Sequence, residues 1–566
     1  MSAVSQPASR KQIRHRLSPD DWLMGAGLCV MVVFLAAFVA GPLVSLLSKS
    51  FEDVDGAWVG LANFIAYFSN EALVISMWNS IWVSLLATII VIPLAFTYAY
   101  ALTRSTIPGK SVFRALALIP ILAPSLLPAL SLVYLFGNKG MLSALIGGSI
   151  YGSAGIVVAQ VFYCFPFALM ILVTALGAAD ARLYEAAQVL GASPLRVFFT
   201  VTLPGAKYGL VSAAFVVFTL VITDFGIPKV IGGNFNVMAI DVYKKVIGQQ
   251  NFQMGAVVGL LLLAPAILSF FVDRWVQKRQ MAVLSARAVP LQPKARPGVD
   301  RALFGFCVVL ALLIMGIVGT AIWGSTIKFW PYNLSPTLAN YDFDEFDGAG
   351  WTSFFNSIRL AAWTALIGTI VVFVGAWLVE KSRSLGLLRG VVQFLAMLPL
   401  AVPGLVLGLS YIFFFNAPAN PLNFLYGTLA IMVLNSLAHF YTVAHLTGVT
   451  ALKQIDPEFE SVSQSLKVPL ARTFLRVSVP VCMPAILDIA IYLFVNAMTT
   501  VSAVIFLYNA DTKPASVAVI NMNDAGQVAA AAAMATMIFL TSAVVRGLHG
   551  IGSSWLLAKT QAWRKR

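Results

Sequence analysis

The chain has 566 residues, of which 59% are hydrophobic and only 11% are charged, and its mean hydropathy is +0.86. This composition excludes an ordinary soluble globular domain and predicts an all-α polytopic membrane protein. A net charge of +14 would suggest nucleic-acid binding in a soluble protein. Here the basic residues gather in every second connection between apolar runs, which the positive-inside rule explains, so we expect no nucleic-acid partner.

Apolar runs follow one another along the chain, and we expect about twelve transmembrane spans of roughly 20 residues each. The first run follows a basic arm and lacks a small-residue cleavage pattern, so it is interpreted as a retained span and not as a signal peptide. Because basic connections mark the cytoplasmic side, both termini are predicted to be cytoplasmic. The expected organisation is a cytoplasmic basic arm (1–21), a first half of six spans (22–276), a cytoplasmic linker (277–300), a second half of six spans (301–548) and a cytoplasmic tail (549–566).

The two halves repeat one another. The matching signatures are Asn79-Ser80-Ile81 with Asn356-Ser357-Ile358, Pro120 and Pro124 with Pro399 and Pro403, and Tyr151-Gly152 with Tyr426-Gly427. Six spans in each copy predict parallel repeats, related by an axis along the membrane normal. Facing spans of two such copies can part without exposing backbone to lipid, so a central pathway between the halves is expected. This organisation favours a transporter.

Two proline pairs interrupt predicted spans. Pro120 and Pro124 fall in the third span, and Pro399 and Pro403 fall in the ninth. Proline inside a helix bends it and frees backbone carbonyls. These residues either allow the core spans to rock or only shape the bundle, and the sequence leaves both readings open.

One amphipathic stretch, EAAQVLGASPLRVFFTVTLP, stands between the fourth and fifth apolar runs. Its spacing of Glu185, Ala186 and Ala187, then Gly191 and then Pro204, resembles the EAA loop of the membrane subunits of ATP-binding-cassette importers. The resemblance implies a type I importer permease fold, in which this loop forms a coupling helix that docks on an ATPase. Small alanines permit close approach of a partner, and a glycine permits a sharp turn. Pro204 is expected to fix the start of the fifth span, and an ordinary surface helix is the alternative.

A degenerate copy of this stretch lies in the second half, so that the two coupling loops are expected at 178–207 and 453–480. Pro480 aligns with Pro204 and Asp456 with Asp180, which places Ser461 at the glutamate position and Lys467 at the glycine position. Glu460, one residue earlier, is the candidate replacement for the missing carboxylate. We expect this second loop still to dock, and we expect damage to the first loop to reduce transport more.

The sequence predicts no catalysis by this chain. It contains no GxxxxGK[ST] motif, so ATP and magnesium are expected on a separate ATPase, and two coupling loops suggest two copies of it. The resemblance further implies a periplasmic solute-binding protein as partner, in a bacterial inner membrane where lipid surrounds the spans. No cofactor or metal is expected, because Cys29, Cys164, Cys307 and Cys482 have no paired spacing and are interpreted as packing residues.

The substrate prediction comes from two segments, 223–256 and 497–533, which resemble the 2-aminoethylphosphonate permeases. The expected function is therefore import of 2-aminoethylphosphonate by alternating access. Ferric iron or thiamine import by the same mechanism is the alternative. An ion-driven secondary transporter is a further alternative, which would require carboxylates at matching depth in both halves.

Polar residues inside the membrane are costly and so become candidates for the substrate pathway. Asp224 near the end of the fifth span, Asp488 in the eleventh, and Asn435 and His439 in the tenth are the candidates, with His445 close by. A carboxylate could bind the ammonium group of an aminophosphonate, and a histidine could bind its phosphonate. The alternative is that these groups only hydrogen-bond between spans.

Overall fold

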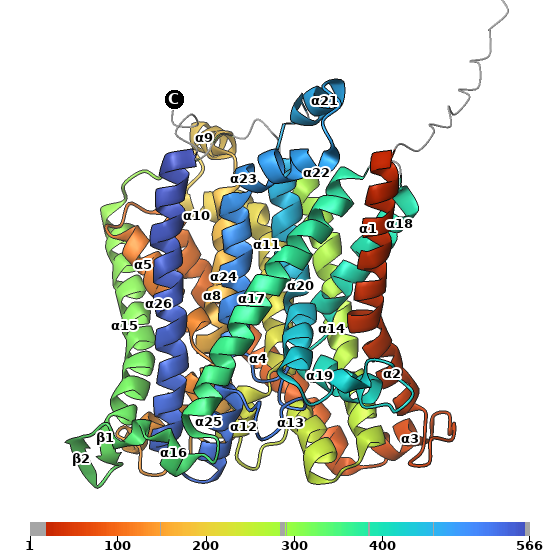
Figure 1. Cartoon of the computed structure of the whole chain (residues 1–566). Coiled ribbons are helices and arrows are strands. Elements are labelled where there is room, and N and C mark those ends of the chain that lie inside the picture. The colour runs from red at the N-terminus through yellow and green to blue at the C-terminus, as the bar shows by residue number, and fades with distance from the viewer. Residues whose placement is uncertain are drawn as a thin grey trace, which may run out of the picture.

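The computed structural model describes residues 19–147, 149–283, 289, 291–382, 385–456 and 458–560. Nine helices in this part of the chain are long and apolar enough to cross a membrane, and there are up to 12 spans if each of three sharply bent helix pairs counts as one. They form one bundle with α9 and α21 projecting from the same end, which we call the loop face (Figure 1). Both ends of the described chain also lie at the loop face.

The first half contains α1 (Pro19–Leu35), η1 (Ala36–Ala40), α2 (Gly41–Ser50), α3 (Ala62–Phe68), α4 (Glu71–Arg104), α5 (Lys110–Ala117), η2 (Ile119–Leu122), α6 (Leu126–Phe136), α7 (Ser143–Ile146), α8 (Ser153–Gly177), α9 (Ala181–Val189), α10 (Pro194–Val197), η3 (Phe198–Thr202), α11 (Leu203–Thr223), α12 (Gly226–Ile231), α13 (Met238–Tyr243), η4 (Lys244–Gly248) and α14 (Phe252–Val283).

The second half contains α15 (Pro297–Ser325), β1 (Ile327–Phe329), β2 (Asn333–Pro336), η5 (Ala339–Tyr341), α16 (Phe343–Phe346), α17 (Gly350–Lys381), α18 (Gly386–Met397), η6 (Leu398–Ala401), α19 (Gly404–Phe415), η7 (Asn423–Leu425), α20 (Leu429–Lys453), α21 (Glu458–Ser465), α22 (Leu470–Thr473), η8 (Phe474–Ser478), α23 (Val479–Val481), α24 (Met483–Thr499), α25 (Ala515–Asp524) and α26 (Val528–Thr560). β1 and β2 form a small antiparallel hairpin.

The bent pair of the third span, α5 and α6, makes a single crossing. α4 and α8 pack side by side and run parallel, because Arg104 Nη2 donates to Leu176 O (2.5 Å) at their ends, while the Tyr98 and Phe165 rings meet further along (5.5 Å). Two parallel neighbours require the chain between them to return across the bundle, and α5, η2 and α6 supply that return. The prediction of about twelve spans is therefore confirmed.

The breaks in the third and ninth spans fall at the predicted prolines. A 3₁₀ turn that contains Pro120 joins α5 to α6 across a bend of 98°, and one that contains Pro399 joins α18 to α19 across a bend of 116°. The eleventh span is also broken, by 75°, which was not predicted. Its signal was present in the sequence, since Pro480 and Pro484 have the same four-residue spacing as the other two pairs.

Equivalent hydrogen bonds recur in the two halves. The Met238 amide donates to Ser80 Oγ, and the Ala515 amide donates to Ser357 Oγ, both at 2.8 Å. Asn79 and Asn356, the neighbouring residues in the repeated signature, each donate to backbone carbonyls of the same two connections. The sequence repeat is thus a structural repeat, in which the second and eighth spans anchor the chain that follows the fifth and eleventh.

The first span of each half packs on the other half. Gly27 of α1 lies so close to α17 that an added Cβ would be 2.9 Å from Leu378 Cδ2, and the Tyr411 hydroxyl of α19 donates to Phe38 O (2.7 Å). On the opposite flank, α15 packs on α4, α5 and α6 of the first half (Figure 1). The two halves thus exchange their first spans. Residues 22–276 and residues 301–548 are therefore not separate compact bodies.

The connection between the halves contains more helix than the expected linker at 277–300. α14 continues to Val283, and α15 begins at Pro297, whose missing N–H suits the first turn of a helix. Hydropathy marks where a span leaves the membrane but not where its helix ends. The described part of the linker without helix is therefore Val289 and residues 291–296.

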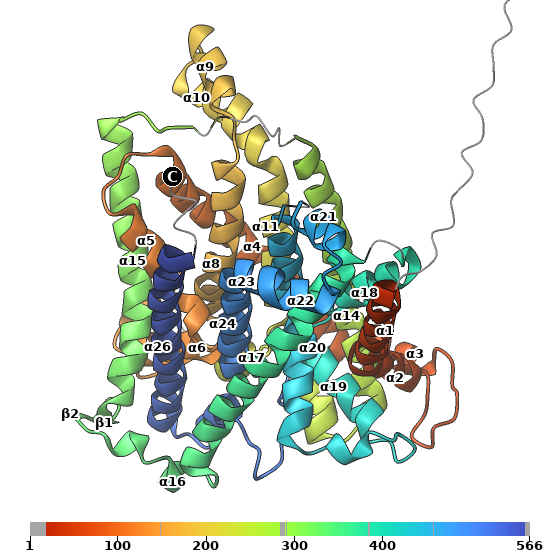
Figure 2. The same ribbon diagram turned by 45° about the horizontal axis from the view of Figure 1, so that its top comes forward.

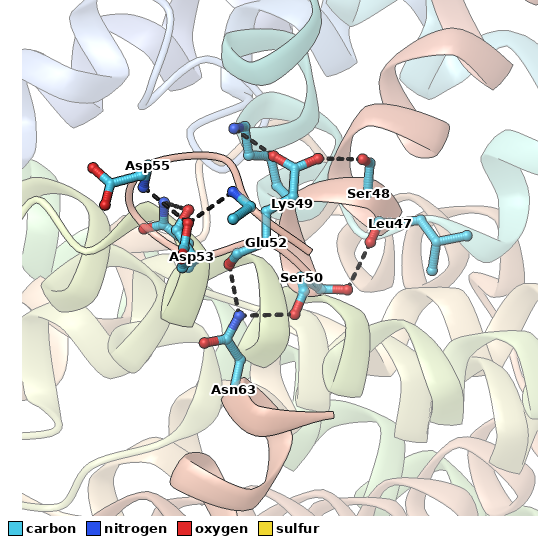
Figure 3. A network of polar contacts seen from close by, with 10 residues as sticks. Leu47, Ser48, Lys49, Ser50, Glu52, Asp53, Asp55 and Asn63 are labelled. Carbon is cyan, nitrogen blue, oxygen red and sulfur yellow. Dashed lines mark hydrogen bonds and ion pairs between the residues drawn. The ribbon is translucent and has the colours of Figure 1, made fainter. Parts of the chain in front are cut away.

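A polar network orders the connection that follows α2 (Figure 3). Asn63 Nδ2 donates to the carbonyls of Ser50 and Glu52, while Lys49 and Ser48 hydrogen-bond the Glu52 carboxylate. The bond from Lys49, followed by that from Ser48, lowers the pKa of Glu52 from its ordinary value. The chain is thereby turned back toward α3 at the face opposite the loop face.

Candidate functional site

A cavity of about 740 Å³ lies between the two halves. α11 and α14 of the first half line one side, and η6, α20 and α24 of the second half line the other. The α20 residues that contribute belong to the end of that helix nearest α21, so the cavity lies toward the loop face. Its lining residues are Val216, Thr219, Leu220, Ala266, Ser269, Phe270, Leu400, Val443, Leu446, Thr447, Thr450, Ala451, Gln454, Pro484, Ala485 and Asp488.

The halves meet at the face opposite the loop face. Lys229 Nζ of α12 pairs with Asp524 Oδ2 of α25 at 2.9 Å, and the Tyr243 and Phe506 rings stack with centroids 6.4 Å apart. Each of these contacts joins one half to the other. The bundle is therefore closed at this face, while its inter-half cavity lies toward the loop face.

Three hydroxyls of the cavity wall present hydrogen-bond acceptors, while the Gln454 amide can also donate. Thr219 and Ser269 both donate their hydroxyl protons to Phe215 O (2.8 and 3.0 Å), and Thr447 donates to Val443 O (2.9 Å). A hydroxyl has one proton and two lone pairs, so each of these oxygens is left with acceptor capacity only. These three oxygens suit a cation or a donor-rich solute.

Asp488 supplies the charge of the cavity. Of the described residues that line it, only Asp488 is ionisable, and its side chain is 56% exposed. His549 Nε2 of α26, which is not among the cavity-lining residues, lies 3.4 Å from Asp488 Oδ1. When protonated, the imidazole is close enough to form an ion pair with the carboxylate. The geometry of the two groups does not meet the criteria for a hydrogen bond.

Asp224 lies elsewhere. Its Oδ2 accepts hydrogen bonds from Gln160 Nε2 (2.9 Å) and from the Ile227 amide (3.0 Å), so the side chain holds the start of α12 against α8. Among the described residues, Asp224 is not one of those that line the inter-half cavity. Its contacts match the interhelical hydrogen bonding that the sequence left open for it.

Asn435 and His439 of α20 contact non-helical backbone of the second half, after α24 and at the break in the ninth span. Asn435 is fully buried and donates from Nδ2 to Ala503 O at 2.5 Å. His439 Nε2 lies beside Gly404, the first residue after the break, where an added Cβ would approach it to 3.1 Å. His445, one turn and a half further along, is buried against Gln393. These polar groups support irregular backbone inside the bundle.

The first coupling loop is a short helix with defined ends. The Asp180 carboxylate accepts from the Arg182 amide (3.1 Å) and begins α9. Gly191 ends it in the left-handed region (φ +69°), and the Ala192 amide reaches back five residues to Ala187 O (3.0 Å), as in a Schellman turn. Glu185 and Ala186 lie on the exposed surface between these ends, and Ala187 is half-buried.

The second loop has the same backbone with different side chains. Asp456 Oδ1 accepts from the Glu458 amide (2.9 Å), and the Val468 amide reaches back to Ser463 O (3.0 Å). Lys467 takes φ +51°, so the residue aligned with Gly191 occupies the same left-handed region without being glycine. Ser461 is exposed on α21. Glu460 belongs to α21, but its side chain lies outside the described part of the structure.

Pro204 and Pro480 do not mark the start of the next span. The helix runs unbroken from Pro194 to Thr223 through a π turn, η3, and Pro204 follows that turn directly. The turn η8 precedes Pro480 in the same way. A π turn removes one hydrogen bond from the ordinary ladder, so it accommodates a residue that has no N–H to donate.

Both loops expose apolar side chains at the loop face. Val189 and Leu190 are 88% and 84% exposed at the end of α9, and Leu466 is 70% exposed at the equivalent end of α21. Phe459 and Val462 extend the apolar surface along α21. Contiguous apolar surface at a helix that projects from the bundle is typical of a protein-binding site.

The chain resembles known transport proteins over most of its length. It is 27% identical to the "Ferric transport system permease protein FbpB" of Actinobacillus pleuropneumoniae over 96% of this chain and 80% of that protein. It is 23% identical to the "Putative 2-aminoethylphosphonate transport system permease protein PhnU" of Salmonella typhimurium over 46% of this chain and 94% of that protein. A solved bacterial alginate ABC transporter chain superposes with a TM-score of 0.39 and 14% identity, covering 46% of this chain and 96% of that chain.

The family model described as "Binding-protein-dependent transport system inner membrane component" matches residues 92–281 and 372–554, one copy in each half. Such permeases bind no cofactor, and a partner ATPase hydrolyses the ATP. The chain therefore belongs to this family, and it is a multi-pass inner-membrane permease subunit of an ATP-binding-cassette importer and not itself an ATPase.

Proposed function

We propose that α9 and α21 are the docking elements for two copies of a cytoplasmic ATPase. Three features support this: both helices project from one face, both end in the same left-handed turn, and both expose apolar side chains. The loop face is then cytoplasmic, together with both termini. The face that carries α12 and α25 is periplasmic and receives the solute-binding protein.

The substrate that we propose is ferric iron. The observation that carries this proposal is the cavity wall, in which hydroxyl oxygens act as acceptors and the one charged lining residue is the carboxylate Asp488. Hard cations prefer oxygen ligands of this kind. An aminophosphonate carries an anionic group that needs a cationic partner, and among the described lining residues there is none.

The names of the relatives support the same choice. The ferric transport permease aligns along nearly the whole chain, whereas the aminoethylphosphonate permease aligns with less than half of it. Import of 2-aminoethylphosphonate, which the sequence favoured, is therefore the second candidate and takes its support from that partial alignment.

In the mechanism that we propose, the structure corresponds to an inward-facing state. Closure of the ATPase dimer moves α9 and α21 together, the Lys229–Asp524 contact opens, and the cavity becomes accessible to a docked binding protein. Solute then enters the space beside Asp488, and release of the hydrolysis products returns the bundle to the state seen here.

Binding-protein-stimulated ATP hydrolysis by the reconstituted complex tests this substrate. The solute-binding protein that docks on this permease should stimulate hydrolysis when it is loaded with ferric iron and not when it is loaded with 2-aminoethylphosphonate. Stimulation by the phosphonate alone would reject ferric iron and restore the second candidate. Stimulation by neither ligand would reject both.

A further inference from the structure

Because the first spans are exchanged, α14 and α15 reach the loop face at separate places. α14, the last span of the first half, ends at this face, and α15 begins there on the far flank, where it packs on α4, α5 and α6. The described part of the linker runs from the start of α15 toward the base of α9 and α10 (Figure 2). The chain has one inter-half linker, so this route passes one coupling helix and not the other.

The linker hydrogen-bonds both ends of α9. Val289 O accepts from the Ala181 amide at 2.9 Å, which satisfies an N–H that the first turn of a helix leaves without an internal partner. The Val289 amide in turn donates to Asp180 Oδ1 (3.3 Å). At the other end of the helix, Lys294 Nζ donates to Gln188 Oε1 (3.3 Å).

The far end of the linker is also fixed. Asp300 Oδ2, in the first turn of α15, accepts from the Arg296 amide (3.0 Å) and from Thr106 Oγ1 (2.6 Å). Thr106 belongs to the connection between α4 and α5. The segment made of Val289 and residues 291–296 is thus held between α9 and a core connection of the first half, and we call it the strap.

We propose that the strap is a positioning element that holds the first coupling helix in its docking orientation before an ATPase binds. α21 is braced in a different way, within its own loop, where Ser463 hydrogen-bonds Thr473. The two coupling helices therefore differ in the contacts that hold them in place as well as in sequence. This inference rests on the proposed docking role of α9.

The test combines Val289→Pro, which removes the donor to Asp180, with Lys294→Ala, which removes the contact with Gln188. Two measurements are made on the full chain in nanodiscs: amide hydrogen exchange of α9, and the half-saturating concentration of ATPase subunit for assembly. Two hydrogen bonds of ordinary net strength correspond to a change of about thirtyfold. Val289→Pro keeps the carbonyl that accepts from Ala181, so the readout is exchange over the whole of α9. We expect the α9 amides to exchange faster by up to that factor and assembly to weaken comparably, with the melting temperature unchanged.

Controls separate positioning from general damage. Arg in place of Ala at position 294 keeps a donor for Gln188. The Lys294→Arg variant should therefore assemble better than Lys294→Ala. Lys328→Ala, an exposed lysine on β1 at the opposite face, should change neither readout. If hydrogen exchange in α9 is unchanged in the double variant, the strap does not order the helix and the inference is overturned.

The remaining outcomes distinguish the inference from the proposed function. If exchange accelerates but assembly is unaffected, while Gly191→Arg weakens assembly, the docking role stands and the strap inference is overturned. If Gly191→Arg also leaves assembly intact, the docking role of α9 fails, and the strap inference fails with it.

Discussion

Removing the ion pair between Lys229 and Asp524 is expected to loosen the closed face of the bundle. Asp524→Asn keeps the shape of the side chain and removes its charge. The partners are 21% and 44% exposed, so solvent screens the pair and its contribution is about 0.5 to 1 kcal/mol. Lys229 also lies 5.3 Å from the Tyr243 ring, and that contact survives the substitution. At 1.4 kcal/mol per factor of ten, the open state gains about two- to fivefold in population.

The assay is ATP hydrolysis by the assembled transporter in nanodiscs without binding protein. In the proposed mechanism, hydrolysis in that condition is limited by how often the closed face opens, so Asp524→Asn should raise it by the same two- to fivefold. Exchanging the charges with Lys229→Asp and Asp524→Lys should return it toward the original rate. Asp511→Asn, an exposed acid on the same face, is the matched control. An unchanged rate in Asp524→Asn, or a higher rate in the charge exchange than in the single variant, would refute the reasoning.

Two further predictions concern the coupling loops, and a third concerns Glu52 at the opposite face. Gly191→Ala places a Cβ in open space but in the left-handed region, so it should destabilise the end of α9 by about 1 kcal/mol, while Lys467→Gly should not destabilise α21; hydrogen exchange of the two helices measures both. Glu185→Arg should reduce uptake more than Ser461→Arg, and equal losses would count against unequal loops. Because the pKa of Glu52 is lowered by Lys49, its stabilising contribution is present above the unfolded pKa and lost as pH falls through the folded value. The difference in melting temperature between the wild type and Glu52→Gln should therefore disappear at pH well below 4.5, and its persistence there would contradict the assignment.

Much of the fold could be predicted from local patterns in the sequence. Apolar run length gives the spans, and the repeated Asn-Ser-Ile signature has a physical cause, since Ser80 and Ser357 accept equivalent backbone amides. The exchange of α1 and α15 could not be predicted, because an apolar face in a membrane does not identify the helix that covers it. The third break was missed although Pro480 and Pro484 repeat a spacing that had been interpreted correctly twice.

The candidate pathway residues also divide into features that the sequence shows and features that only the fold shows. A charge inside a span is visible in the sequence, and for that reason Asp488, which lines the inter-half cavity, was a candidate. Asp224 has the same charge, but its partners Gln160 and Ile227 come from distant or turning segments that only the fold brings together. The acceptor character of the wall was also missed, because it depends on hydroxyls such as Thr447 donating to their own helix. Residues 447, 450 and 454 recur at helical spacing, which was the signal available.

Uptake of radiolabelled ferric iron into proteoliposomes that contain the complete transporter tests the central proposal most directly. With Asp488→Asn, the cavity loses its one charge among the described lining residues, so uptake should fall by about tenfold while binding-protein-stimulated hydrolysis persists. Glu380→Gln, which changes an acid outside this cavity, should leave uptake intact. Undiminished iron uptake by Asp488→Asn would contradict the proposed pathway, and the absence of iron uptake by the wild type would contradict the proposed substrate.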